Sequence, residues 1–240
     1  MKRWALLFVV SFPTLAGVDV LSLKPALVFE ANRGQSPAEY KFVAVGPDHA
    51  LLLSPTNATV RHAGGTVRIH WRGGRQLAAM DGLEPRTGKV NYLIGNRPSR
   101  WLAGIQTYSK VRYKGIYPGV DLVFHGTQGE LEFDFVVAPG ADPGVIRLSF
   151  EDASQMDIDA SGDLVLKEPL LRLRRPVIYQ DGPRGRRSIE GSYSVLGTGE
   201  AGFRIAGYDK SQPLVIDPVL SFSTYLGGSS TENVTAGGDM

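Results

Sequence analysis

Residues 120–137 alternate acidic side chains and one histidine with apolar residues, and this pattern is one candidate for a ligand site in the sequence. Asp121 and His125 are four residues apart on an expected strand, so they share one of its faces. Glu132 and Asp134 reach the same face from the returning strand of an expected hairpin. Carboxylate oxygens are the preferred ligands of Ca²⁺. Asp121, Glu132 and Asp134 are therefore the candidate metal ligands, with Ca²⁺ as the best-matched cation, although the sequence as a whole predicts no cofactor.

Two other interpretations of this acidic face remain open. Paired carboxylates perform acid–base chemistry in glycosidases, whereas alternation on a half-buried hairpin also produces a solvated polar face without any site. A four-residue loop at 126–129 would place His125 opposite Glu130 and Asp121 opposite Asp134. The second pair sets two like charges against each other, which is unfavourable without a cation or an arginine nearby.

Arginines are concentrated between residues 172 and 187, where strand-like segments alternate with turns. Guanidinium groups on a strand edge could bind anionic glycans, lipopolysaccharide or a phosphate backbone. A charged strand face that protects a sheet edge from aggregation is the alternative. The candidate ligand-binding residues are Arg172, Arg174, Arg175, Arg186 and Arg187.

Several kinds of chemistry lack the residues they need. The 240 residues include no cysteine, which excludes disulfides, thiolate metal sites and a cysteine nucleophile. The four histidines do not have the spacing of a zinc protease, and no serine-hydrolase element accompanies a suitably placed histidine. A formal net charge of +2 gives no indication of nucleic acid binding. The sequence thus predicts no catalytic residue and no enzymatic activity.

The elements that would position these residues are short alternating segments separated by turns rich in glycine and proline, of which the chain has 29 and 15. This pattern predicts an all-β fold, a large antiparallel β-sandwich of many short strands with little helix. Residues 77–83 are the only stretch for which we expect one helical turn. In the hairpin at 120–137 we expect every apolar residue to face the core. These residues are Leu122, Phe124, Leu131, Phe133 and Phe135.

The N-terminus has the order of a secretory signal peptide. Lys2 and Arg3 precede an apolar run at 4–12, and Ala16 is suited to a cut before Gly17. The run is shorter than the ~20 residues that a membrane-spanning helix needs, and no later segment is apolar enough to span. We therefore expect export to the medium or the cell surface, a signal peptide at 1–16 and no transmembrane span.

The C-terminal segment Thr224-Tyr225-Leu226-Gly227-Gly228 resembles the opening of the bacterial β-propeller repeat called SBBP. The motifs before it resemble an uncharacterised β domain that precedes such repeats in large bacterial surface proteins. This resemblance implies a secreted β-rich domain without catalytic residues at 17–218, followed by the truncated start of a repeat at 219–240. The motifs lie at 29–35, 91–95, 101, 108, 117–122, 139–143, 176–180 and 213–218.

These observations predict a non-enzymatic structural or interaction module acting in adhesion, scaffolding or envelope contacts. Its expected partners are a protein or cell-envelope component, with propeller repeats present in longer relatives and no nucleic acid. One alternative is a carbohydrate-binding or carbohydrate-processing domain, in which Trp71 and Trp101 could stack on sugars. Another is an assembly module whose open strand edge at 219–225 recruits a partner strand.

Overall fold

The computed structural model describes residues 27–221 except 47–48, 64, 128–129, 152, 154 and 168–170. The expected signal peptide at 1–16 therefore lies outside the described residues, as does most of the expected repeat start at 219–240.

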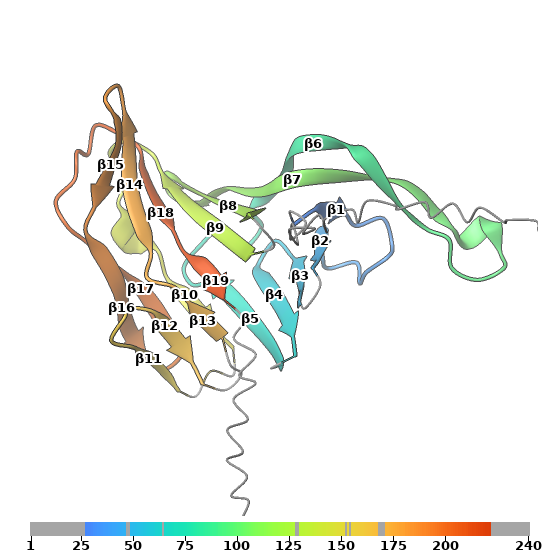
Figure 1. Cartoon of the computed structure of the whole chain (residues 1–240), viewed down its shortest axis with the longest axis horizontal. Coiled ribbons are helices and arrows are strands. Elements are labelled where there is room, and N and C mark those ends of the chain that lie inside the picture. The colour runs from blue at the N-terminus through green and yellow to red at the C-terminus, as the bar shows by residue number, and fades with distance from the viewer. Residues whose placement is uncertain are drawn as a thin grey trace, which may run out of the picture.

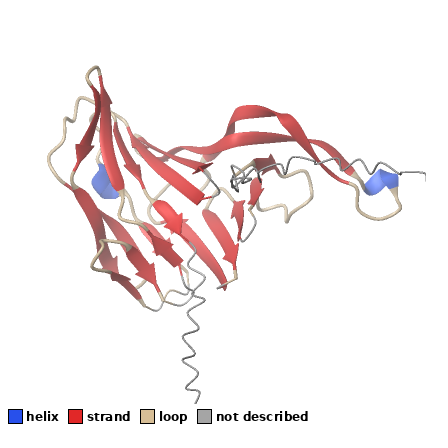
Figure 2. Cartoon of the chain, viewed as in Figure 1, coloured by secondary structure: helices blue, strands red, loops and turns tan. Residues whose placement is uncertain are grey.

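The fold is all-β (Figure 2) and antiparallel, as the sequence predicts, and the strands of the described residues belong to one 19-stranded sheet. Among the described residues the only helical elements are two short 3-10 turns, and none is long and apolar enough to cross a membrane. The elements are β1 (Phe29–Ala31), β2 (Phe42–Val45), β3 (His49–Leu53), β4 (Asn57–His62), β5 (Gly65–Trp71), β6 (Ala79–Tyr92), η1 (Pro98–Arg100), β7 (Leu102–Tyr117), β8 (Val120–Thr127), β9 (Glu130–Val137), η2 (Pro143–Val145), β10 (Leu148–Phe150), β11 (Met156–Ile158), β12 (Leu164–Leu166), β13 (Leu171–Leu173), β14 (Val177–Gly182), β15 (Gly185–Ile189), β16 (Gly191–Gly197), β17 (Glu200–Ile205), β18 (Leu214–Asp217) and β19 (Val219–Ser221).

The long strand β7 joins the two halves of the sheet. One half continues from β7 through β8 and β9 to β18 and β19, which pair in turn with β14 and β13. The other half runs from β7 through β1, β2, β3, β4, β5 and β10 to β17 and β16. The sheet curves so far that the halves face each other and form a nearly closed, barrel-like body (Figure 1).

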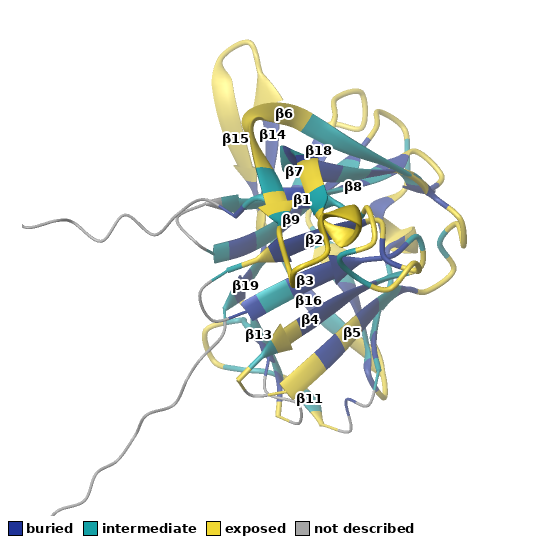
Figure 3. Ribbon diagram, turned by 90° about the vertical axis from the view of Figure 1, so that its right-hand side faces the viewer, coloured by how far each residue is buried: buried dark blue, intermediate teal, exposed yellow. Residues whose placement is uncertain are grey.

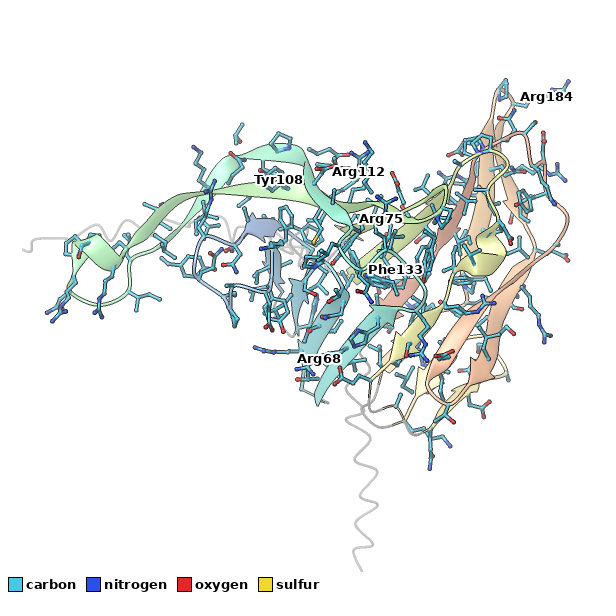
Figure 4. The ribbon with its side chains drawn as sticks, turned by 180° about the vertical axis from the view of Figure 1, so that it is seen from behind. Arg68, Arg75, Tyr108, Arg112, Phe133 and Arg184 are labelled. Carbon is cyan, nitrogen blue, oxygen red and sulfur yellow. The ribbon has the colours of Figure 1, made fainter. Side chains whose placement is uncertain are left out.

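The core lies between these halves and is built from one face of each alternating strand. In β8 and β9 every expected core residue is fully buried, so the predicted one-sided burial of this hairpin is confirmed. Phe133 points into the interior (Figure 4), with its ring centroid 5.5 Å from that of Phe124 and 5.8 Å from that of Phe135. Trp71 packs in the same core, edge-on to Tyr113 at 5.8 Å. Aromatic residues therefore fill much of the space between the halves.

The register of the β8–β9 hairpin differs from the prediction by two residues. The first strand continues further than expected, to Thr127, whereas the second begins at Glu130 as expected, and His125 pairs with Glu132. The predicted opposition of Asp121 and Asp134 is therefore wrong, because Asp121 faces Val136 instead. A shift of two residues leaves every side chain on its predicted face, since the side-chain period of a strand is also two.

The expected helical turn at 77–83 is wrong, because β6 begins at Ala79 and pairs with β7. β6 and β7 form a long two-stranded arm that leaves the barrel and ends at η1 (Figure 1). The cross-strand hydrogen bonds to β7 outweigh the weak local preference of this segment for a helix.

The expected open edge at 219–225 is absent in the part that is described. β19 pairs with β9 through Val219 and Leu220, and with β13 through Leu220 and Ser221. Leu220 thus has a partner strand on both of its sides.

Candidate functional site

Four titratable side chains meet on the outer face of the barrel where β8, β9 and β18 run side by side. His125 and Glu132 face each other across the hairpin. Ile216 of β18 pairs with Phe135 of β9, and the next residues along these antiparallel strands are Asp217 and Asp134. Because the side chains of Ile216 and Phe135 fill the core, those of their neighbours point outward.

The distances in this acid–histidine cluster (His125, Glu132, Asp134 and Asp217) are short. The imidazole Nε2 of His125 lies 3.0 Å from Asp134 Oδ2, and its Nδ1 lies 3.3 Å from Glu132 Oε2. One ligand atom each from His125, Asp134 and Asp217 lie within 4.8 Å of one another. The side chains of His125, Glu132 and Asp134 are only 16–20% exposed. The cluster is thus shielded yet reachable from solvent.

The carboxylates perturb one another and the imidazole. Burial, followed by the charges of Asp134 and Glu132, raises the pKa of Asp217 to about 6. For His125, burial is the largest influence and lowers the pKa, but the hydrogen bond to Asp134 and the charges of Asp134 and Glu132 together raise it. Among the described residues, Asp134 Oδ1 and Asp217 Oδ1 are shielded from solvent and have no hydrogen-bond partner. The cluster therefore concentrates negative charge that is only partly compensated.

Of the predicted metal ligands, Glu132 and Asp134 belong to this cluster, whereas Asp121 does not. The backbone N–H of Gly115 donates to Asp121 Oδ1 at 2.7 Å, and Arg112 Nη1 lies 3.9 Å from Asp121 Oδ2. Asp121 is thus engaged by β7, and the structure does not bring it together with Glu132 and Asp134. The sequence analysis did not identify Asp217 as part of this cluster. Alternation predicts that its side chain faces outward from the buried strand β18, but only the pairing of strands brings it next to Asp134.

Three of the five predicted ligand-binding arginines are paired with carboxylates of this chain. Arg172 Nη1 contacts Asp159 and also donates to Asp163 at 2.8 Å. Arg174 makes two hydrogen bonds to Glu130, the shorter at 2.7 Å. Arg186 pairs with Asp181 at 3.0 Å, and its guanidinium carbon lies 3.5 Å from the centroid of the Tyr179 ring.

The structure does not bring the five arginines into one patch. Arg172, Arg174 and Arg175 lie on β13 or directly after it, whereas Arg186 and Arg187 lie on β15. Arg175 packs its side chain against Gly162. Arg187 and Arg184 both border a hollow of about 440 Å³. Arg184 lies at the far end of the β14–β15 hairpin (Figure 4). The expected single basic surface is thus replaced by ion pairs and separated groups.

The end of the β6–β7 arm is a second candidate site that the sequence reasoning missed. Leu93 is 58% exposed, Ile94 76% and Trp101 39%, and η1 between them has no buried residue (Figure 3). Trp71, the other tryptophan of the sugar-stacking alternative, is in the core and only 6% exposed. The two tryptophans therefore do not form one exposed platform. The sequence carried one signal for the long strand β7, namely the alternating positions of Ile105, Thr107, Val111 and Tyr113.

Comparisons with known proteins identify the domain. A family model described as a domain of unknown function (DUF7948) matches residues 29–219. No curated protein and no solved structure matches the chain. The matched range runs from the first strand of the barrel into the last, so it covers the acid–histidine cluster and the whole arm. The chain belongs to the DUF7948 family of domains of unknown function.

Proposed function

We propose that this DUF7948 domain is a non-enzymatic interaction module of an exported bacterial surface protein, and that it contacts a partner protein through the end of the β6–β7 arm. The observation that carries the proposal is the arm itself, which projects from the barrel and exposes Leu93, Ile94 and Trp101 at its end (Figure 1). Clustered exposed apolar side chains of this size are typical of interaction sites.

The charges of the arm indicate the chemistry of the partner. Residues 85–107 contain Arg86, Lys89, Arg97 and Arg100 but no aspartate or glutamate. An acidic surface with an apolar pocket would complement this segment. We favour a protein over a lipid or glycan because tryptophan and arginine side chains dominate the binding energy of protein interfaces.

Local hydrogen bonds hold the end of the arm in one conformation. Gly104 N–H donates to the Asn91 side-chain oxygen at 2.7 Å, and Trp101 Nε1 donates to the carbonyl of Gly95 at 3.1 Å. The Tyr92 hydroxyl donates to Glu30 Oε2 at 2.7 Å and so ties the arm to strand β1. A surface that is ordered before binding loses less conformational entropy when the partner docks.

Binding measurements on a tip variant test this proposal. Envelope proteins and lipopolysaccharide from the same bacterium are passed separately over the immobilised full-length chain. We expect the protein fraction to bind, and the double substitution Leu93→Ser with Ile94→Ser to weaken that binding at least about tenfold, since two central anchors are lost. Leu196→Ser, which changes an exposed leucine on β16, is the matched control and should have no effect. Equal binding by the tip variant, or binding of lipopolysaccharide alone, would contradict the proposal.

Export and a neighbouring propeller are also part of the proposal, supported by the basic and apolar N-terminus and by the motif at 224–228. Expression of the full chain in a bacterial host, followed by N-terminal sequencing of the exported product, tests the first point. The mature chain should begin at Gly17. Retention in the cytoplasm with Met1 uncleaved would show that the N-terminus is not a signal peptide.

A further inference from the structure

We infer that His125, Asp134 and Asp217 form a binding site for one divalent transition-metal ion, with Zn²⁺ the best match. This inference is independent of the function proposed for the arm. It rests on the convergence of three potential ligands from three different strands, on the position of Glu132, and on two shielded carboxylate oxygens.

The spacing of the three side chains suits a small ion. Zn²⁺ bonds to nitrogen and oxygen at about 2.0–2.2 Å, so the ligand atoms of a tetrahedral site are roughly 3.4 Å apart. His125 Nε2 and Asp134 Oδ2 are 3.0 Å apart, and a ligand atom of Asp217 lies within 4.8 Å of both residues' ligand atoms. Small side-chain rotations would therefore complete the geometry while β8, β9 and β18 stay in place.

Glu132 acts as the positioning residue for the imidazole. Its Oε2 lies 3.3 Å from His125 Nδ1, whose N–H can donate a hydrogen bond to it. When Nδ1 carries the hydrogen and an ion is bound, the lone pair of the imidazole is on Nε2, the nitrogen that faces Asp134. Histidines that bind metals usually donate their other ring N–H to a carboxylate in this way.

Two carboxylate oxygens in the cluster lack the partners that buried polar atoms normally have. Asp134 Oδ1 and Asp217 Oδ1 are shielded from solvent, and with both carboxyl groups ionised neither accepts a hydrogen bond from the described residues. Such atoms require an explanation, and a bound ion is one that supplies the missing partner. The nearby arginines Arg174 and Arg186 do not serve this purpose, because each already pairs with another carboxylate.

The ligand set also indicates which ion is bound. Ca²⁺, which the sequence pattern suggests, takes six to eight oxygen ligands. Here one of three ligands is an imidazole nitrogen, which suits Zn²⁺ and its neighbours better. Because the side chains are partly exposed, a fourth position remains open to water.

Calorimetric titration of the tag-free, chelator-treated full chain with ZnCl₂ tests the inference. We expect one Zn²⁺ per chain. Asp217→Asn and His125→Gln should each weaken binding by more than about 100-fold, and Glu132→Gln by about 10–100-fold, as expected for the loss of a supporting carboxylate. Glu151→Gln is the matched control, because Glu151 also pairs with a histidine, His70, at 3.2 Å on another part of the barrel. It should leave Zn²⁺ binding unchanged.

Circular dichroism in chelator confirms that each variant is folded, and visible absorption of bound Co²⁺ provides a second measurement on the unmodified chain. Intense absorption typical of tetrahedral nitrogen–oxygen coordination supports the inference. Absence of Zn²⁺ binding at millimolar concentration would overturn it, as would undiminished binding by a folded Asp217→Asn variant. Binding of Ca²⁺ without binding of Zn²⁺ would show that His125 is not a ligand.

Discussion

The barrel and the arm are both built from alternating antiparallel strands, yet they place their apolar side chains in opposite environments. In β8 and β9 the apolar residues fill the core, and the acidic ones lie on the outer face with His125. At the end of the arm Leu93, Ile94 and Trp101 remain exposed. The difference arises because the barrel strands have a second layer of sheet opposite them, whereas the distal arm has none to pack against.

This comparison separates stability from recognition. Burial of apolar area in the barrel is the main favourable contribution to folding, so changes there should alter the free energy of unfolding. The distal arm contributes little buried surface, so changes there should alter binding and leave the free energy of unfolding nearly unchanged. Three changes to the chain, presented in order of their expected effect on the free energy of unfolding, test this distinction.

The largest change in the free energy of unfolding is expected for Phe133→Ala. Phe133 is fully buried between Phe124 and Phe135, so its truncation leaves a cavity and should lower the free energy of unfolding by about 3–5 kcal/mol. Urea denaturation followed by circular dichroism measures this change. Phe133→Leu, which keeps most of the volume, should cost less. A loss below about 1 kcal/mol for the alanine variant would mean that the barrel core does not dominate stability.

Asp217→Asn in the metal-free protein is expected to raise the free energy of unfolding, by less than the amount that Phe133→Ala lowers it. The folded-state pKa of Asp217 is raised to about 6 by burial and by neighbouring carboxylates. The native state therefore holds the proton more tightly than the unfolded chain, and stability falls as the pH rises from about 4 through 6.

Asparagine cannot ionise, so this variant should be more stable than the wild type by about 1 kcal/mol at pH 7.5, after allowance for screening by solvent. The difference should vanish near pH 3.5. Thermal melts in chelator at both pH values measure it. A variant that is less stable than the wild type at pH 7.5 would show that the Asp217 carboxylate is not under strain in the metal-free cluster.

The smallest effect on stability is expected when residues 93–101 are replaced by an Asn-Gly turn. This change shortens the arm and removes its exposed apolar side chains but leaves the barrel intact. The free energy of unfolding should change by less than about 0.5 kcal/mol, as for other surface changes. A larger destabilisation in the same urea experiment would show that the end of the arm supports the fold.

Much of the local structure could be predicted from the sequence. The two-residue alternation in 120–137 identified the hairpin and its buried face, and it placed Glu132 and Asp134 on the outer face. The register was wrong by two residues because the loop length cannot be read from alternation, which is unchanged by such a shift. Asn32, in the motif at 29–35, bonds backbone groups through both its side-chain nitrogen and its side-chain oxygen, as asparagines in turns commonly do.

What depends on distant strands could not be predicted in this way. Asp217 joins Asp134 only because β18 pairs with β9, and Arg174 is neutralised by Glu130, 44 residues away in the chain. Composition and periodicity are enough to predict an all-β chain with one apolar face per strand. Which outward faces meet, which charges pair and which strands extend beyond the barrel follow from the folded structure, because strand pairing depends on contacts between distant segments and not on local preference.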